Sequence, residues 1–170
     1  MSTTFFISDT HFGHANILKF TEDDDSLIRP GFGCVEEMNE HMIKCWNSVV
    51  GPQDKVIHCG DVAFGKEALN LCHRLKGIKY LVMGNHDNYD IHSYLDIFHK
   101  LHGVKYIGRN EAICTHVPIH NTSLRDFKVN IHGHLHTSEI NDPRYFNVSV
   151  EQIDYTPISL DEIKEIVANR

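Results

Sequence analysis

Short apolar runs recur along the chain, and polar segments follow most of them. Runs of four to eight residues rich in β-branched and aromatic side chains are typical of strands. Five runs of this kind are predicted as strands: Thr3–Ser8, Lys55–Cys59, Lys79–Met83, Ala112–Cys114 and Lys128–Ile131. Val104–Ile107 is expected to pair with the fourth run across Gly108-Arg109-Asn110, and Tyr145–Val150 is expected to form a further strand.

Between these runs the apolar residues recur at helical spacing. In the segment Val35–Val49, Met38, Met42 and Trp46 fall on one face, and Gly51-Pro52 follows it. This pattern predicts an amphipathic helix with Trp46 in the core. Further helices are expected over Glu67–Lys76, Ile91–Leu101 and Leu160–Ala168, the last capped by Ser159, with a short helical turn over Ile17–Phe20.

The order of these elements indicates an α/β protein. Strands alternate with helices in the first half and follow one another in the second, which favours two packed mixed sheets with helices outside. A chain of 170 residues is expected to form a single domain, residues 1–170. Hydrophobic residues make up 41% of the chain, but no apolar run approaches the roughly 20 residues that a membrane helix needs, so no membrane partner is expected.

The cellular compartment is predicted from two absences in the sequence. The N-terminus carries no basic and cleavable apolar segment of the kind that directs export. The five cysteines are odd in number and lack a C-x-x-C spacing, so we expect them to be reduced and mostly in the core. Both features favour a cytoplasmic protein.

Charge narrows the class of partner. The formal net charge of −7 argues against a tight binder of long nucleic acid, because such proteins present a clustered basic face. The acidic run Glu22–Asp25 is predicted to be a solvated loop, since it lacks paired histidines and does not follow a strand. The sequence gives no indication of a protein partner or of an oligomeric state.

Polar segments at the strand ends carry the candidate chemistry. They are Asp9-Thr10-His11, Gly60-Asp61, Gly84-Asn85-His86-Asp87, Thr115-His116 and Gly133-His134-Leu135-His136. Carboxylate, amide and imidazole groups delivered by such loops are what a site for two neighbouring divalent metals needs. Seven side chains are available: Asp9, His11, Asp61, Asn85, His116, His134 and His136. They can serve two metals if one carboxylate bridges, and Asp61 is the natural bridge as the lone carboxylate of its segment.

This ordered set resembles the calcineurin-like metallophosphoesterase superfamily, whose pattern runs D-x-H, G-D, G-N-H-D/E, H and G-H-x-H. Every element is present in order from Asp9 to His136, about four-fifths of the chain. The opening segment from Ser8 to Ile17 further resembles small bacterial and phage phosphoesterases of this superfamily. The resemblance implies a four-layer α/β/β/α sandwich of two mixed β-sheets flanked by helices.

The resemblance also implies roles for individual residues. One metal would be held by Asp9, His11, Asp61 and His136, and the second by Asp61, Asn85, His116 and His134. A hydroxide bridging the two ions would attack the phosphate ester. His86 matches the superfamily's catalytic histidine, which binds no metal and donates a hydrogen bond to phosphate or a proton to the leaving oxygen. Asn85 and His86 would both contact the substrate.

The metals are expected to be two divalent transition-metal ions. Mixed nitrogen and oxygen ligands suit manganese, iron, zinc, cobalt or nickel, and four histidines disfavour calcium and magnesium. Manganese is favoured for activity.

Two features depart from the superfamily's minimal pattern. Phosphoprotein phosphatases read G-D-x-x-D-R-G, but Phe64 and Gly65 stand at the later Asp and Arg positions here. This argues against phosphoprotein phosphatase activity and leaves the orienting partner of His86 unidentified, with adjacent Asp87 one possibility. The other departure is His14, which follows His11 in a glycine-containing loop and is a candidate contact for substrate phosphate.

The expected substrate is a small phosphodiester, such as a nucleotide or a nucleic-acid end. A monoester carries an additional charge and rewards arginine clamps, and the arginine position of the phosphatase motif is Gly65. Arg109 and Arg125 lie in predicted loops and remain candidates to reach the site. Only seventeen residues separate His116 from His134, so an open, shallow site is expected. The alternatives are a nucleotide phosphomonoesterase and a non-catalytic metal-binding scaffold.

Overall fold

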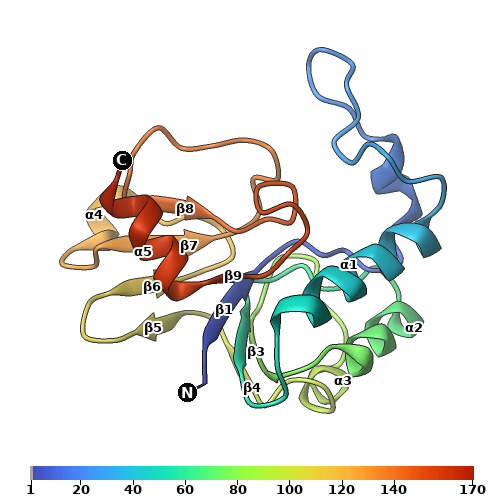
Figure 1. Cartoon of the computed structure of the whole chain (residues 1–170), viewed down its shortest axis with the longest axis horizontal. Helices are drawn as coiled ribbons and strands as arrows, with labels where there is room; N and C mark the ends of the chain where they lie inside the picture. The colour runs from blue at the N-terminus through green and yellow to red at the C-terminus, as the bar shows by residue number, and fades with distance from the viewer. Residues whose placement is uncertain (1) are drawn as a thin grey trace.

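A five-stranded mixed sheet forms one half of the protein (Figure 1). The computed structural model describes residues 2–170. The strands are β1 (Thr4–Ile7), β2 (Lys55–His58), β3 (Ile78–Val82), β4 (Lys100–His102) and β9 (Ile158–Ser159), in the order β4-β3-β2-β1-β9. β1 to β4 run parallel, and β9 pairs antiparallel with β1. Because parallel strands point the same way, the loops that follow β1, β2 and β3 leave from the same edge of the sheet.

A second sheet of four strands packs against the first. Its strands are β5 (Lys105–Ile107), β6 (Ala112–Cys114), β7 (Val129–His132) and β8 (Tyr145–Asn147), in that order. β5 and β6 form the expected antiparallel hairpin, whereas β6, β7 and β8 are parallel. A parallel bridge between Ser8 and Ser149 joins the ends of β1 and β8, so the loops after the strands of both sheets meet at one edge.

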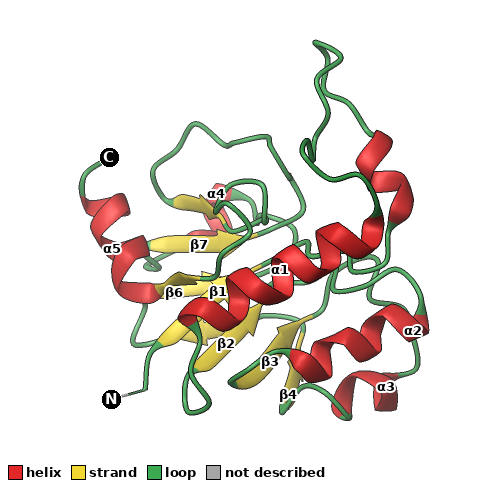
Figure 2. Ribbon diagram, turned by 45° about the vertical axis from the view of Figure 1, so that its right-hand side comes forward, coloured by secondary structure: helices red, strands yellow, loops and turns green. Residues whose placement is uncertain are grey.

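Helices cover the outer faces of the sheets (Figure 2). α1 (Val35–Val49), α2 (Lys66–Leu69) and α3 (Ile91–Leu95) lie on one side of the first sheet, together with the 3₁₀ helices η1 (Ala15–Lys19) and η2 (Asn70–Arg74). α4 (Asn121–Leu124) lies against the second sheet, where Leu124 is buried with Ile113. α5 (Leu160–Ala168) inserts Ile163 into the core between the sheets. The fold is therefore α/β with two mixed sheets and helices outside.

The alternation of side chains along β1 explains how one strand serves two cores. Phe5 and Ile7 point to a cluster under α1 that includes Trp46. Phe6, on the opposite face, packs with Ile57 in the cluster between the two sheets. Trp46 is buried as predicted, and its ring nitrogen donates a hydrogen bond to the Lys76 carbonyl at 2.9 Å.

Most predicted elements are present, several with ends shifted by one or two residues, and three depart further from the prediction. The helix expected over Ile91–Leu101 ends at Leu95, and its last residues instead form β4 beside β3, because strand pairing outweighs the local helical pattern. The helix expected over Glu67–Lys76 divides into α2 and η2, and the strand expected over Tyr145–Val150 ends at Asn147. α1 and α5 have the predicted bounds, and Ser159 forms a capping box with Glu162 at the start of α5.

Two further predictions concern the state of the cysteines and the presence of membrane-spanning helices. All five cysteines are free, and Cys59, Cys72 and Cys114 are buried, as expected. Within residues 2–170 the structure has no helix with both the length and the apolar character that crossing a bilayer requires.

Candidate metal centre

The polar segments predicted from the sequence converge at the shared edge of the two sheets. Backbone hydrogen bonds join their loops directly: the Asp9 amide donates to the Gly60 carbonyl at 2.9 Å, and the Gly133 amide donates to the His116 carbonyl at 3.0 Å. Asp9, His11, Asp61 and His116 are buried, whereas Asn85 and His134 are exposed. The site therefore has a buried floor of carboxylates and imidazoles beneath an exposed rim.

The backbone of these loops is unusual. Ten residues other than glycine have positive φ angles in the described chain, and five of them are predicted ligands: Asp9, His11, Asp61, His134 and His136. A side chain disfavours this region, and such residues gather at sites where surrounding structure forces the conformation. The concentration at this one edge therefore makes it a candidate functional site, independently of the residue types.

One half of the site, which we call the Glu151 side, contains Asp9, His11 and His136. Ligand atoms from these three residues lie within 4.8 Å of one another. The rings of His11 and His136 stack with centroids 5.4 Å apart. Neither ring nitrogen of His11 has a hydrogen-bond partner among residues 2–170, and nor does Asp9 Oδ1. These buried polar atoms lack the partners that such atoms almost always have.

The other half, which we call the Asp87 side, contains Asp61, Asn85, His116 and His134. His116 Nδ1 lies 2.8 Å from the Cys59 carbonyl oxygen. Its Nε2 lies 2.9 Å from Asn85 Oδ1 and 3.3 Å from Asp61 Oδ2. The His134 ring packs edge-on against that of His116 with centroids 5.1 Å apart. Asp61 Oδ2 also lies 3.6 Å from His11 Nε2, so this oxygen faces both sides.

The Asp87 side is named after the carboxylate of Asp87, which holds the loops of this side together. Asp87 accepts hydrogen bonds from the backbone amides of Asp61, Gly84 and Val62, each at 2.8 to 2.9 Å. Within residues 2–170 Asp87 makes no hydrogen bond to the His86 ring, so the structure does not support the role in orienting His86 that the sequence left open.

Two glycines permit the close approach of neighbouring loops. A Cβ atom at Gly84 would collide with the Asp61 carboxylate, and one at Gly133 would collide with Asp9 and Ser8. Glycine is therefore required at both positions for the carboxylates to reach the centre of the site.

Three supporting residues were missed by the sequence analysis: Arg29, Ser149 and Glu151. Arg29 is buried and donates to the backbone carbonyls of Asp9 and Thr10, and its Nε donates to Glu151 at 2.7 Å. Glu151 in turn accepts a hydrogen bond from His136 Nδ1 at 3.0 Å. Because a carboxylate only accepts, this contact leaves His136 Nε2 free to bind a ligand.

Ser149 supports the first carboxylate. Its hydroxyl lies 2.9 Å from Asp9 Oδ2, which also accepts the His134 amide at 2.9 Å. Ser149 and Glu151 follow β8 just as the predicted ligands follow their own strands. A polar segment after an apolar run was therefore the sequence pattern that could have identified these two residues. Arg29 lies in a loop twenty residues beyond Asp9, and no local pattern identifies it.

Burial and neighbouring charge set the pKa values of the cluster. Burial raises the pKa of Asp9, and burial together with the positive charge of Arg29 lowers that of His11 to about 3. Burial opposes ionisation of Asp61, yet the hydrogen bond and charge of His116 lower its pKa to about 2. Burial likewise opposes the charged form of His116, whose pKa the carboxylates of Asp61 and Asp9 nevertheless raise. The anionic form of Asp61 and the cationic form of His116 are thus favoured together, whereas a proton on His11 is disfavoured.

His86 and His14 line the exposed rim. The His86 amide donates to Asp61 Oδ1 at 2.9 Å, and its ring lies 5.7 Å from that of His11. His14 Nδ1 accepts a hydrogen bond from the Ile17 amide at 3.1 Å and caps η1. Burial lowers the pKa of His14. Because Nδ1 accepts the amide hydrogen bond, the neutral ring carries its hydrogen on Nε2. Both side chains are placed beside the cluster without belonging to the close ligand groups.

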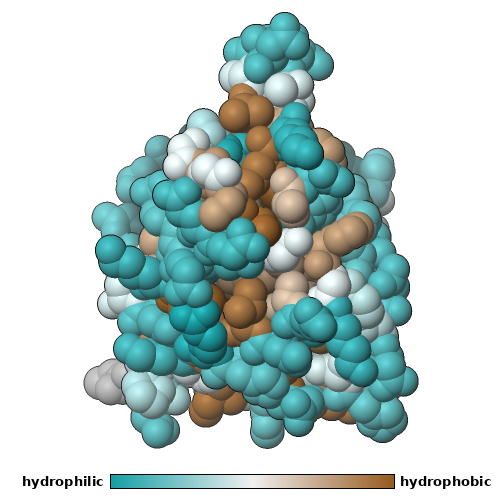
Figure 3. All heavy atoms as spheres, turned by 90° about the vertical axis from the view of Figure 1, so that its right-hand side faces the viewer, coloured by the Kyte–Doolittle hydropathy of each residue, from teal (hydrophilic) through white to brown (hydrophobic). Residues whose placement is uncertain are grey.

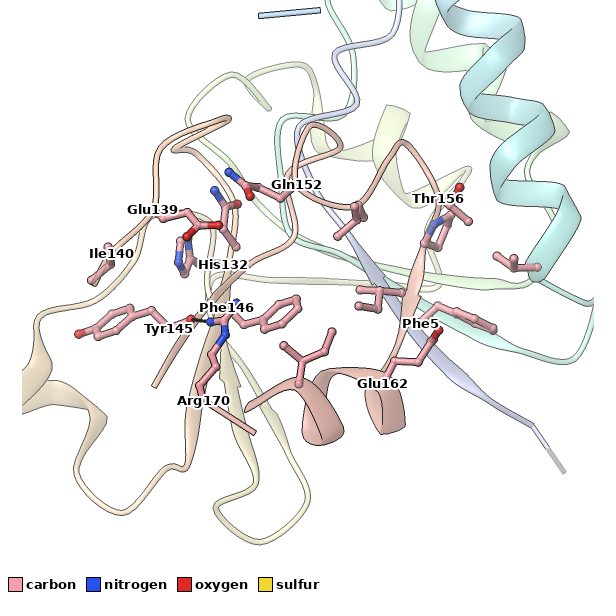
Figure 4. Close-up of a pocket in the computed structure, with 16 residues that line it drawn as sticks. Phe5, His132, Glu139, Ile140, Tyr145, Phe146, Gln152, Thr156, Glu162 and Arg170 are labelled. Carbon is pink, nitrogen blue, oxygen red and sulfur yellow. Dashed lines mark hydrogen bonds between the residues drawn. The ribbon is translucent and has the colours of Figure 1, made fainter. Parts of the chain in front are cut away.

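A separate cavity of about 370 Å³ lies between β8, the loop that leads to β9, and α5 (Figure 4). Phe146, Gln152, Glu162 and Arg170 are among the residues that line it. The seven predicted ligands, all within the described residues, do not line this cavity. Its amide side chains support the site from behind, since Gln152 donates to the His136 carbonyl at 3.1 Å.

No known family model matches the chain, but individual proteins that resemble it place it in a family. It is 35% identical over 178 residues to the uncharacterized protein MJ1445 of Methanocaldococcus jannaschii, with 98% of this chain and 92% of that protein covered. It is 30% identical over 174 residues to the gene 66 protein of Mycobacterium phage L5, covering 82% of this chain and 80% of the phage protein. The chain therefore belongs to the family of MJ1445.

A solved structure supports the fold. The crystal structure of the protein of unknown function AQ665 from Aquifex aeolicus matches with a TM-score of 0.77 and 25% identity, over 98% of this chain and all of that one. None of these relatives' names specifies an activity, so the function is argued from the site.

Proposed function

We propose that this protein is a dinuclear-metal phosphoesterase of the calcineurin-like type, with the two sheets and their helices forming the four-layer sandwich of that superfamily. The observation that carries the proposal is a buried cluster of hydrogen-bond acceptors at the meeting edge of the sheets. A divalent cation is the partner that such a cluster lacks.

The protonation of His116 shows why a cation fits. Its Nδ1 faces the Cys59 carbonyl, which only accepts, so that nitrogen carries the hydrogen. Its Nε2 then faces Asn85 Oδ1 at 2.9 Å and Asp61 Oδ2 at 3.3 Å, which are two further acceptors. Three acceptors this close require positive charge between them, supplied by a proton or by a metal ion. The raised pKa of His116 records the same demand.

The distances between side chains also fit metal coordination. Two ligands about 2.1 Å from one ion are roughly 3 to 3.5 Å apart at tetrahedral or octahedral angles. Asp61 Oδ2 and His116 Nε2 are 3.3 Å apart, within this range. Asp61 Oδ2 and Asp9 Oδ1 lie 3.6 and 3.8 Å from His11 Nε2, just beyond it. One oxygen of Asp61 faces both halves of the site and would be shared by two ions. Asp9 belongs to both groups of closely spaced ligand atoms, with His11 and His136 and with Asp61 and His116, so it would also lie near both ions.

Each half of the site would hold one ion. Asp9, His11 and His136 would hold the first and Asn85, His116 and His134 the second, with Asp61 shared. Mixed oxygen and nitrogen ligands favour manganese, and iron, zinc, cobalt or nickel would also fit. Two such ions, when bound, lower the pKa of water toward neutrality and neutralise charge on a phosphate group.

The protein's own residues would position and protonate the substrate. His86 is exposed at the rim, tied to the site through its backbone hydrogen bond to Asp61, and is placed to donate a proton to the departing oxygen. The Nε2 hydrogen of His14 would donate to phosphate. Asn85, which is also exposed, would contact the same group.

The arrangement of arginines favours diesters over monoesters. Arg109 lies in the turn before β6, and Arg125 lies in the loop before β7, whereas the site follows the other ends of these strands. The Lys128 amide donates to the Asn110 carbonyl, which places the two loops together at that far end. Arg29 is committed to Glu151 and two backbone carbonyls. None of these three arginines is therefore available to clamp the second charge of a monoester.

A paired assay tests the proposal. We expect the manganese-loaded protein to hydrolyse bis-p-nitrophenyl phosphate with a higher kcat/KM than p-nitrophenyl phosphate. Exhaustive chelation should abolish turnover and added manganese should restore it. A higher efficiency on the monoester would replace the diesterase with a nucleotide phosphatase. Binding of two ions without turnover of any mono-, di- or cyclic phosphate would leave a metal-binding scaffold.

A further inference from the structure

A group of aromatic rings extends from the metal centre to the protein surface. The ring of His14 lies 5.8 Å from that of His11, 4.3 Å from that of Phe64 and 5.6 Å from that of Phe20. His86 lies 5.7 Å from His11 and 6.3 Å from Phe64. We call Phe20 and Phe64, with His14 between them, the aromatic rim.

The two phenylalanines of the aromatic rim are exposed. Phe64 retains 51% of its accessible surface and Phe20 retains 48%. Figure 3 shows hydrophobic side chains gathered in a band on this face, below the hydrophilic tip of the projecting segment. Exposed apolar surface that borders a polar site marks a place where a ligand is covered on binding. Phe64 also occupies the position at which phosphoprotein phosphatases have an acidic residue. This position therefore cannot have the role that the acidic residue has in those enzymes.

The aromatic rim fits a planar heteroaromatic group. Each nucleobase presents a π-face that stacks on aromatic side chains without regard to its sequence. We propose that Phe64 and Phe20 stack the base of a nucleotide whose phosphate ester lies at the metal centre; this inference rests on the proposed phosphoesterase function. The aromatic rings that adjoin His11 lie close to the cluster of candidate metal ligands. A ribose can therefore connect a base stacked on these rings to a phosphate at the cluster.

The segment beside the rim favours short substrates. Residues 20–28 form a projecting hairpin, in which the Ile28 amide donates to the Phe20 carbonyl and the Glu22 amide donates to the Ser26 carbonyl (Figure 1). Its tip carries Asp23, Asp24 and Asp25, all exposed. The Thr137 hydroxyl donates to the Glu22 carboxylate, which ties the hairpin to the loop after His136. A row of carboxylates at this place repels a long phosphate backbone, so a nucleotide or a strand end is the better fit.

Two esters with the same leaving group isolate the contribution of the base. The p-nitrophenyl ester of thymidine monophosphate carries a base, and methyl p-nitrophenyl phosphate does not. Phe64→Leu should raise KM for the thymidine ester roughly 10- to 100-fold, the range of one stacked base, with kcat little changed. KM for the methyl ester should remain as in the wild type. Phe64→Trp should retain the wild-type KM for the thymidine ester, and Phe20→Leu should show a smaller version of the Phe64→Leu effect.

A matched control uses an exposed aromatic residue elsewhere. Tyr106 lies on the edge strand β5, retains 64% of its surface and stacks on Phe127. Tyr106→Leu should change neither KM. Equal effects of Phe64→Leu on the two esters, or none, would overturn the stacking proposal while leaving the phosphoesterase assignment intact.

A binding measurement tests the inference separately from catalysis. Calorimetric titration of the manganese-loaded protein should show that Phe64→Leu weakens binding of thymidine monophosphate and leaves binding of inorganic phosphate unchanged. If neither ester is hydrolysed, the phosphoesterase proposal fails, and this selective loss would still support a base platform. Equal affinities of the variant and the wild type for thymidine monophosphate would overturn it.

Discussion

The two sides of the candidate metal centre are supported in different ways. On the Glu151 side, His11 is buried with neither nitrogen paired within the described chain, while His136 is oriented by Glu151 and Arg29. On the Asp87 side, Asp61 and His116 already have hydrogen-bond partners. The Glu151 side is also the more enclosed, because Asn85 and His134 lie at the exposed rim of the other side.

This difference predicts unequal affinities for metal. A buried polar group without a partner costs about 1–3 kcal/mol, and a cation that satisfies it recovers that free energy. The Glu151 side therefore gains more from a bound ion and should bind it more tightly.

Replacing Asp61, the shared carboxylate, should weaken metal binding on both sides of the site. Asp61→Asn is expected to lower the occupancy of both ions and to reduce turnover by several orders of magnitude, since Asp61 is the anionic ligand that faces both. Asp9→Asn should weaken mainly the ion of the Glu151 side. Elemental analysis and a diester assay measure both effects. An Asp61→Asn protein that keeps two ions and a near-normal rate would show that Asp61 is not shared.

Changing His86 should leave a metal ion bound on both sides of the site. His86→Asn is expected to retain the wild-type metal content and to lower turnover roughly 10²- to 10⁴-fold, the range of a general acid. The loss should be smaller for a nitrophenyl ester than for an alkyl or nucleoside ester, because a good leaving group needs less protonation. Equal losses on both kinds of ester would indicate that His86 positions phosphate instead.

Altering the Glu151 carboxylate should separate the two sides. Glu151→Gln is expected to weaken the tighter ion roughly 10- to 100-fold, as loss of an outer partner of a ligating histidine does, and to spare the weaker one. Glu165→Gln, on the exposed face of α5, is the matched control. Calorimetric titration with manganese resolves the two sites. Equal weakening of both ions would contradict the separate support inferred for the Glu151 side.

A buried histidine beneath the site should make the metal-free protein sensitive to acid. Burial lowers the pKa of His58 to about 3 in the folded state, against about 6.5 when unfolded. Between these values the unfolded chain binds the proton and the folded protein does not, so stability falls as the pH decreases. One such group contributes about 1.4 kcal/mol per pH unit.

Urea denaturation of metal-free protein at pH 7 and pH 5 measures this slope. His58→Gln should have a shallower dependence on pH than the wild type, and the exposed His92→Gln should match the wild type. His58 also bonds Thr10 at 3.0 Å, so an overall loss of stability is expected at both pH values. An unchanged slope in His58→Gln would contradict the folded-state pKa of His58.

The sequence predicts the positions of the candidate ligands well because their signal is local. Asp9, Asp61, His116 and His134 each follow an apolar run, and parallel strands then bring those ends together. Arg29 was missed because it acts on Glu151 across 122 residues of sequence, whereas Glu151 follows β8 and carried the same local signal as the candidate ligands. The helix predicted over Ile91–Leu101 was too long for the same kind of reason, since β4 forms through pairing with β3 rather than through its own pattern.

Anomalous scattering from crystals grown with manganese tests the central claim most directly. We predict two peaks at the edge where the sheets meet, one next to Asp9, His11 and His136 and the other next to Asn85, His116 and His134, with Asp61 between them. The peak on the Glu151 side should be the stronger at limiting manganese. A map with no peak in this cluster at saturating manganese would contradict the metal centre and the function proposed from it.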